Sequence, residues 1–206
     1  LGVKVHATVG AMRETSLDAV KSTAPRPGGM SMEQLFDYQI QQAIIEAKGF
    51  DLLVMGRPEG AGCYCAANNI IRKYMDKLAD TYPYTVMDNE AGLEHLSRRT
   101  TQDTDLLLII SDPTVRGIMT GGRVAELVQE LKLNVKRSVL IVNRVEDGTE
   151  GPLRQAIERT RVEFAGFVPA DDLIFEYDLN GRPLVQLPPD SKALTSYFAM
   201  LDKLVP

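Results

Sequence analysis

The sequence predicts an α/β protein with a doubly wound, mainly parallel sheet and helices on both faces of that sheet. Short, nearly continuous apolar runs recur along the chain, as expected for strands that are buried on both faces. Segments with the apolar spacing of amphipathic helices separate several of these runs, and strand–helix–strand alternation implies parallel crossover connections. At 206 residues, we expect one domain that spans residues 1–206.

Five apolar runs are the predicted strands. They cover residues 50–55, 84–87, 106–110, 139–142 and 164–168, and most are rich in β-branched residues. Chemistry in such sheets lies at the carboxyl ends of the strands, so the residues directly after each run are the candidates for a functional site.

Helical patterns fill most intervals between these strands. The first helix is expected over residues 32–47, because Ser31 and Gln34 form a capping-box pair and Gly49 is a natural stop. Apolar stripes predict helices over residues 67–78 and 124–131. Weaker patterns predict helices over residues 154–161 and 193–204, and residues 20–30, with two prolines and two glycines, are expected to be a surface loop.

Composition and charge exclude several classes of protein. The chain has 23 Lys and Arg against 28 Asp and Glu, a net charge of −5, which disfavours a nucleic-acid partner. No apolar run approaches the roughly 18 residues of a membrane span, and the N-terminus does not resemble a signal peptide, so a cytoplasmic protein without a membrane partner is expected. Two cysteines are too few for a disulfide scaffold.

A carboxylate and a glycine come after the predicted strand over residues 84–87. Asp88 comes directly after this strand, and Gly92 lies four residues further on. Many nucleotide phosphatases use this layout, in which the acid orders a magnesium-bound water and the glycine amide approaches a terminal phosphate. An ordinary turn accounts for the same spacing, and the sequence alone leaves both interpretations open.

Cys63 and Cys65 stand just ahead of the predicted helix over residues 67–78. The positive end of a helix dipole favours thiolates, and the one-residue spacer lets both sulfurs reach one metal ion. Two thiolates are half of a four-ligand shell, which a twofold symmetric dimer would complete. The alternative is a pair of free or buried thiols in a reducing cytosol.

Two further strand ends carry polar residues. Asn143 comes after the strand over residues 139–142, and its amide has both the donor and the acceptor needed to pair with one edge of a purine. A capping role is the alternative for this residue. Pro169 and Asp171 come after the last strand, where a turn and a helix cap are the simpler interpretation.

Together these stretches resemble the carbon monoxide dehydrogenase maturation ATPases of the CooC type, relatives of MinD and of the nitrogenase iron protein. The resemblance runs from about residue 49 to about residue 204, and its sharpest pieces are Cys63-Tyr64-Cys65 and residues 86–96. It implies a P-loop NTPase fold, ATP hydrolysis with Mg²⁺, and a homodimer that supports nickel insertion into carbon monoxide dehydrogenase.

The resemblance also implies roles for individual residues. Asp88 matches the acid near the magnesium, Gly92 the switch glycine, and Asn143 the residue that contacts adenine. Pro169 and Asp171 match the loop beside the adenine of ATP or ADP. Cys63 and Cys65 match the paired cysteines that hold zinc or nickel between two subunits.

One family feature is missing from the sequence. No G-x-x-x-x-G-K-[ST] phosphate loop occurs in these 206 residues, so we expect an N-terminally truncated member, lacking its first strands and inactive as written. An iron–sulfur cluster of the nitrogenase type is disfavoured, because His95 stands where a cysteine is needed. The alternatives are a MinD- or partition-type positioning ATPase and a non-enzymatic regulatory fragment of the same fold.

Overall fold

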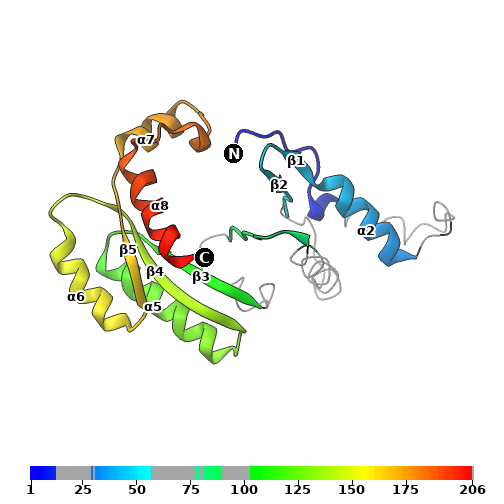
Figure 1. Ribbon diagram of the computed structural model, residues 1–206. Coiled ribbons are helices and arrows are strands. Elements are labelled where there is room, and N and C mark those ends of the chain that lie inside the picture. Colours follow the sequence, from blue (N-terminus) through cyan, green and yellow to red (C-terminus); the bar gives the residue numbers. More distant parts are fainter. Residues whose placement is uncertain (13–28, 30, 57–77, 79–80, 90–102, 206) are drawn as a thin grey trace. The chain divides into compact units, whose positions relative to one another are not determined.

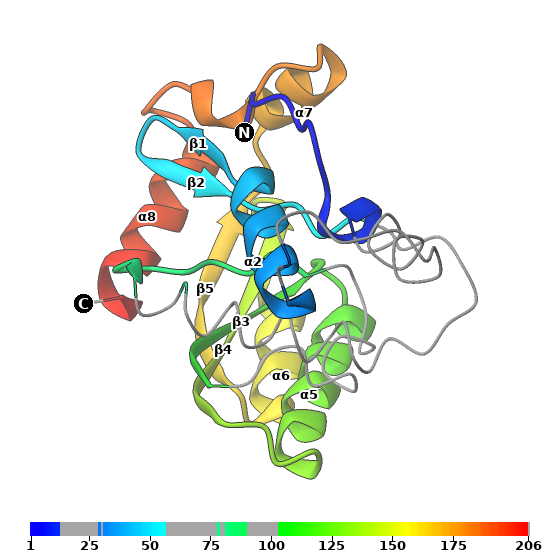
Figure 2. The same ribbon diagram turned by 90° about the vertical axis from the view of Figure 1, so that its right-hand side faces the viewer.

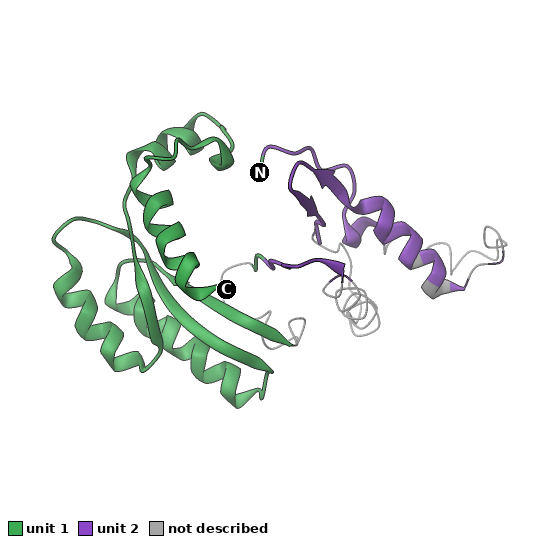
Figure 3. Cartoon of the chain, in the orientation of Figure 1, with its two compact units in different colours: residues 1, 88–206 green, residues 2–87 purple. Residues whose placement is uncertain are grey.

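The computed structural model describes residues 1–12, 29, 31–56, 78, 81–89 and 103–205. The chain divides into two compact units, one of residues 2–87 and one of residues 88–206 with Leu1 (Figure 3). Each unit has its own apolar core among these residues.

The larger unit is built on a parallel sheet of three strands. These are β3 (Thr104–Ser111), β4 (Val135–Val145) and β5 (Glu163–Pro169), with β4 in the centre (Figure 1). Helix α5 (Val115–Glu130) joins β3 to β4, and α6 (Glu150–Thr160) joins β4 to β5. The predicted strands over residues 106–110, 139–142 and 164–168 are confirmed, as is their parallel arrangement.

Helices cover both faces of this sheet, as the sequence predicts. Helices α5 and α6 lie alongside each other on one face, where Leu140 and Val142 of β4 enter the core (Figure 2). Helix α8 (Lys192–Leu204) covers the other face, where Ile141 meets Met200. Neighbouring residues of a strand point to opposite faces, so a central strand covered on both sides is a continuous apolar run.

Two short elements lie between β5 and α8. Helix α7 (Asp172–Leu179) begins directly after Asp171, and the 3₁₀ turn η2 (Leu184–Gln186) comes after it. The Asp171 side chain accepts a hydrogen bond from the Leu173 N–H at 3.0 Å, so it is a helix cap, as the simpler interpretation of the sequence has it.

The smaller unit contains α2 (Met32–Ala43) and an antiparallel hairpin of β1 (Ile45–Ala47) and β2 (Phe50–Leu52). The capping box of Ser31 and Gln34 is present, as predicted. The helix ends at Ala43 rather than at residue 47, because the next residues enter β1. Gly49 has φ of 90° and lies in the hairpin turn, where a left-handed residue is needed, rather than at a helix end.

Two of the predicted strands are corrected by the structure. The run over residues 50–55 forms the short β2 in an antiparallel pair, not a strand of the parallel sheet. The run over residues 84–87 forms no strand, and Val86 is 91% exposed. An apolar run enters a sheet only where a neighbouring strand pairs with its backbone, and residues 84–87 belong to neither of the described sheets.

Helix α5 approaches the sheet closely at Gly121. A Cβ added there would lie 2.9 Å from Cδ1 of Leu140 and 3.2 Å from Cγ2 of Ile109. We therefore expect Gly121→Val to lower the free energy of unfolding by about 1–3 kcal/mol through overpacking, as measured by urea unfolding followed by circular dichroism. The control is Gly151→Val in α6, because a Cβ at Gly151 meets nothing within 4 Å. Equal destabilisation by the two variants would contradict this packing.

Candidate functional site

A cavity of about 330 Å³ lies at the carboxyl edge of the parallel sheet in the larger unit. One wall consists of residues from the ends of the three strands: Ile110, Ile141, Asn143 and Val168. The other wall comes from α7, η2 with its flanking residues, and α8: Ile174, Leu184, Leu187, Ala193, Leu194 and Tyr197. Open α/β sheets bind small molecules just outside the carboxyl ends of their strands, so this cavity is the candidate site.

Asn143 brings a side-chain amide to this mostly apolar lining. The pairing of β4 with β5 shifts in register between Val142 and Val145, so Asn143 lies in an irregular stretch of β4. Its Oδ1 accepts a hydrogen bond from the Arg144 N–H at 2.9 Å. Among the described residues the amide has no second partner, which leaves both N–H groups of Asn143 able to donate.

Arg144 adopts the left-handed conformation, with φ of 56°. A non-glycine residue in this region costs on the order of 1–3 kcal/mol, and such strain clusters at binding sites. The Arg144 N–H belongs to the peptide unit that joins it to Asn143, so its hydrogen bond to Oδ1 is set by the torsions of Asn143 itself and orients the amide that lines the cavity.

The Asp171 carboxylate holds the first turns of two helices. Besides the Leu173 N–H of α7, it accepts the Ser191 hydroxyl at 2.6 Å and the Ala193 N–H of α8 at 3.1 Å. Ser191 is fully buried, and its Oγ accepts from the Leu194 N–H at 3.2 Å. The hydrogen bond from Ser191, together with weaker contributions from the backbone, holds the pKa of Asp171 below its usual value, although burial opposes this shift.

The other predicted site residues lie apart from the cavity lining or outside the described part of the chain. Pro169 ends β5 opposite Val145, and the next N–H, of Ala170, donates to the Val145 carbonyl at 2.9 Å. Asp88 is exposed. Cys63, Cys65 and Gly92 lie outside the described residues. Within the described ranges, no group of three His, Cys, Asp or Glu side chains is placed to hold a metal ion.

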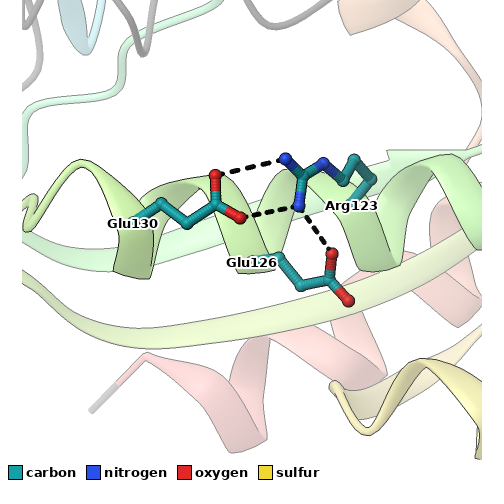
Figure 4. A network of polar contacts seen from close by, with 3 residues as sticks. All are labelled: Arg123, Glu126 and Glu130. Carbon is teal, nitrogen blue, oxygen red and sulfur yellow. Dashed lines mark hydrogen bonds and ion pairs between the residues drawn. The ribbon is translucent and has the colours of Figure 1, made fainter.

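Charged side chains on the sheet and on α5 form exposed ion pairs with one another. On α5, Arg123 donates to Glu126 at 2.9 Å and to Glu130 at 2.8 and 3.1 Å (Figure 4). The hydrogen bond to Glu130 is the main cause of the raised pKa of Arg123. Arg137 of β4 donates to Glu163 of β5 at 2.6 Å in the same way. Water screens such exposed pairs, so we assign them to the surface and not to a binding site.

The second wall of the cavity is the part that sequence reasoning missed. Ser191 carried a usable signal, since a serine just ahead of a predicted helix is a typical cap. Its bond to Asp171 spans 20 residues along the chain, and no local pattern reports a contact of that kind.

Similar proteins identify the family. The uncharacterized ATP-binding protein MJ0685 of Methanocaldococcus jannaschii is 38% identical over 205 residues, which is 100% of this chain and 81% of that protein. The chain belongs to this family of ATP-binding proteins. No family model matches the chain.

A more distant relative is the carbon monoxide dehydrogenase accessory protein CooC of Rhodospirillum rubrum, which is 27% identical over 172 residues. The match covers 81% of this chain and 64% of CooC.

Among solved structures, a ParA family ATPase from Chlorobium tepidum TLS superposes with a TM-score of 0.66 at 17% identity, covering 98% of this chain and 77% of that one. The MinD cell division protein of Aquifex aeolicus has a TM-score of 0.64 at 16% identity, covering 92% and 78%. The fold is therefore the MinD/ParA-like α/β fold. None of the described helices is long and apolar enough to span a bilayer.

Because the Asp171 carboxylate accepts N–H groups at the start of both α7 and α8, we expect the free energy of unfolding to depend on pH. We expect Asp171→Asn to lower the free energy of unfolding by about 1–2 kcal/mol at pH 7, because the ionised carboxylate accepts hydrogen bonds from two helices. The folded pKa lies below its ordinary value of 3.8, so this stabilisation is present above about pH 4 and is lost as the pH falls through the folded pKa.

Urea unfolding of the wild type and the variant over a pH series measures this difference. The control is Asp172→Asn, which removes the neighbouring exposed carboxylate of α7. A gap between wild type and Asp171→Asn that stays constant down to the lowest pH would contradict the account.

Proposed function

We propose that the cavity binds the adenine base of ATP or ADP. The observation that carries this proposal is a cavity with apolar walls and one side-chain amide at the carboxyl edge of a parallel sheet, in a family of ATP-binding proteins. Apolar side chains such as Val168 and Leu187 would cover the faces of a flat ring, and the Asn143 amide would pair with its edge. The volume lies within the range of about 300–1,000 Å³ that is usual for small-molecule sites.

Removing the amide tests this assignment. We expect Asn143→Ala to weaken the binding of AMP by about 2- to 10-fold, because one hydrogen bond contributes about 0.5–1.5 kcal/mol. Isothermal titration calorimetry with AMP measures the change. Gln155→Ala is the matched control, since it removes an exposed amide from α6 outside the cavity. Equal AMP affinity of Asn143→Ala and wild type would reject the role of Asn143.

We propose further that Asp88 and Gly92 serve the phosphate end of the nucleotide. This rests on their match to the family pattern and on the exposed position of Asp88. A magnesium ion held through water by Asp88 would neutralise phosphate charge, and the Gly92 amide would approach the terminal phosphate. Since these 206 residues contain no G-x-x-x-x-G-K-[ST] loop, hydrolysis would require phosphate-binding groups from outside them.

The cellular role that we propose is an ATP-dependent maturation factor that supports nickel insertion into carbon monoxide dehydrogenase. The distant relation to CooC supports it, and so does the chemistry of Cys63 and Cys65. Thiolates suit zinc and nickel, and two of them are half of a four-ligand set, which the same pair from a second subunit would complete.

The double variant Cys63→Ala/Cys65→Ala tests the metal site. We expect the wild type to bind one Zn²⁺ or Ni²⁺ per two chains and to dimerise with the metal, and the double variant to lose both properties. Equilibrium dialysis and light scattering measure them. The control is His6→Ala, which removes an exposed metal-ligating side chain of another type. A double variant that stays dimeric and binds as much metal as wild type would refute the interface site.

A further inference from the structure

We propose that Asp171 is a positioning residue that acts through Ser191 to hold the second wall of the cavity at the right distance from the first. The inference rests on the proposed binding of adenine in this cavity. It assigns Asp171 a role that needs no contact with the nucleotide, because Asp171 itself does not line the cavity.

The two walls are held in different ways. Backbone pairing of β3, β4 and β5 holds the strand ends that form the first wall, with a register shift between β4 and β5 at Asn143. Six of the ten lining residues belong to the second wall, and all six come after Asp171 in the chain. Both helices of that wall contact the sheet: Ala193 and Met200 of α8 pack with Ile141 and Val168, and Ile174 of α7 packs against the same cluster.

The Tyr177 side chain of α7 holds the following residues, up to Gln186, against this helix. The buried Tyr177 of α7 donates its O–H to the carbonyl of Gln186 at 2.9 Å. Arg182 donates to the same hydroxyl at 2.9 Å, and its Cζ lies 3.9 Å from the centre of the Tyr177 ring. These contacts hold Arg182 and Gln186 against α7, which keeps Leu184 and Leu187 beside Ile174 in the same wall.

The Asp171 carboxylate links α7 to the N-terminus of α8, and we call its contacts with Leu173, Ser191 and Ala193 the joint. Its Oδ2 takes both the Ser191 hydroxyl and the Ala193 N–H, while Oδ1 holds the N-terminus of α7. Ser191 is fully buried, so water does not replace its hydroxyl when that group is removed. The N-terminal ends of α7 and α8, and with them the spacing of the two walls, are therefore held by this joint together with the packing of Ile174 on the sheet.

Small errors in this spacing matter for a flat ring. A gap of about 0.5–1 Å on one face already forfeits a quarter to a half of the dispersion attraction there. Loosening the joint should therefore weaken binding of the base while leaving the Asn143 amide in place. A residue that merely stabilised the fold would not produce this selective loss.

The experiment compares wild type with Ser191→Ala, which removes the hydroxyl, and with Ser191→Thr, which keeps it. AMP titration calorimetry measures affinity, and amide hydrogen exchange measures protection of residues 180–190. We expect Ser191→Ala to bind AMP at least about 5-fold more weakly and to exchange faster over this segment, and Ser191→Thr to restore both. Ser196→Ala, which removes another hydroxyl of α8 outside the cavity lining, should match wild type.

Should Ser191→Ala fail to fold, Asp171→Glu keeps the charge but lengthens the joint, and the same loss of AMP affinity is expected from it. Unchanged AMP affinity in the folded variant overturns the inference and leaves adenine binding intact, whether or not the segment exchanges faster. A wild type that binds no AMP instead overturns the proposed function, and the inference falls with it.

Discussion

The burial of β4 on both faces is the constraint on which the larger unit depends. Residues 139–142 are at most 1% exposed, with successive side chains facing α5 and α6 or facing α8. Such a strand must be central and must have helices on both sides. Because its neighbours run parallel to it, their carboxyl ends meet at one edge, and the cavity lies there.

The pairing of β4 becomes irregular after Val142, where the continuously buried part of the strand ends. After Val142 its pairing with β5 shifts in register, and Arg144 takes a left-handed conformation. At this edge the Asn143 oxygen accepts a hydrogen bond from the Arg144 N–H, which orients the amide, and the left-handed Arg144 is a local conformational cost of the irregular strand end.

Much of this could be predicted from the sequence, and the failures share one cause. The strands around residues 106–110, 139–142 and 164–168 were predictable because burial on both faces leaves a continuous apolar run. The run over residues 84–87 has the same pattern but belongs to neither of the described sheets, and a local pattern does not report which strands meet. Gly49 shows the same limit, since a glycine after a helical stripe suits a helix end and a hairpin turn equally.

Some features of the candidate site were predictable from the sequence and others were not. Asn143 was predictable because it stands directly after a buried strand, where parallel sheets place their binding residues, and it does line the cavity. Asp171 stands at a similar position, but its link to Ser191 is a tertiary contact that depends on how α7 and α8 meet. The positions of Cys63, Cys65 and Gly92 remain predictions from the sequence.

The most direct test of adenine binding in this cavity is the location of the bound base. Intermolecular nuclear Overhauser effects between the H2 and H8 protons of AMP and the methyl groups of the chain measure it. The account predicts contacts from the ring to methyl groups of both walls, those of Ile110 and Val168 on one side and of Leu187 on the other. Contacts confined to methyl groups outside the cavity would contradict it.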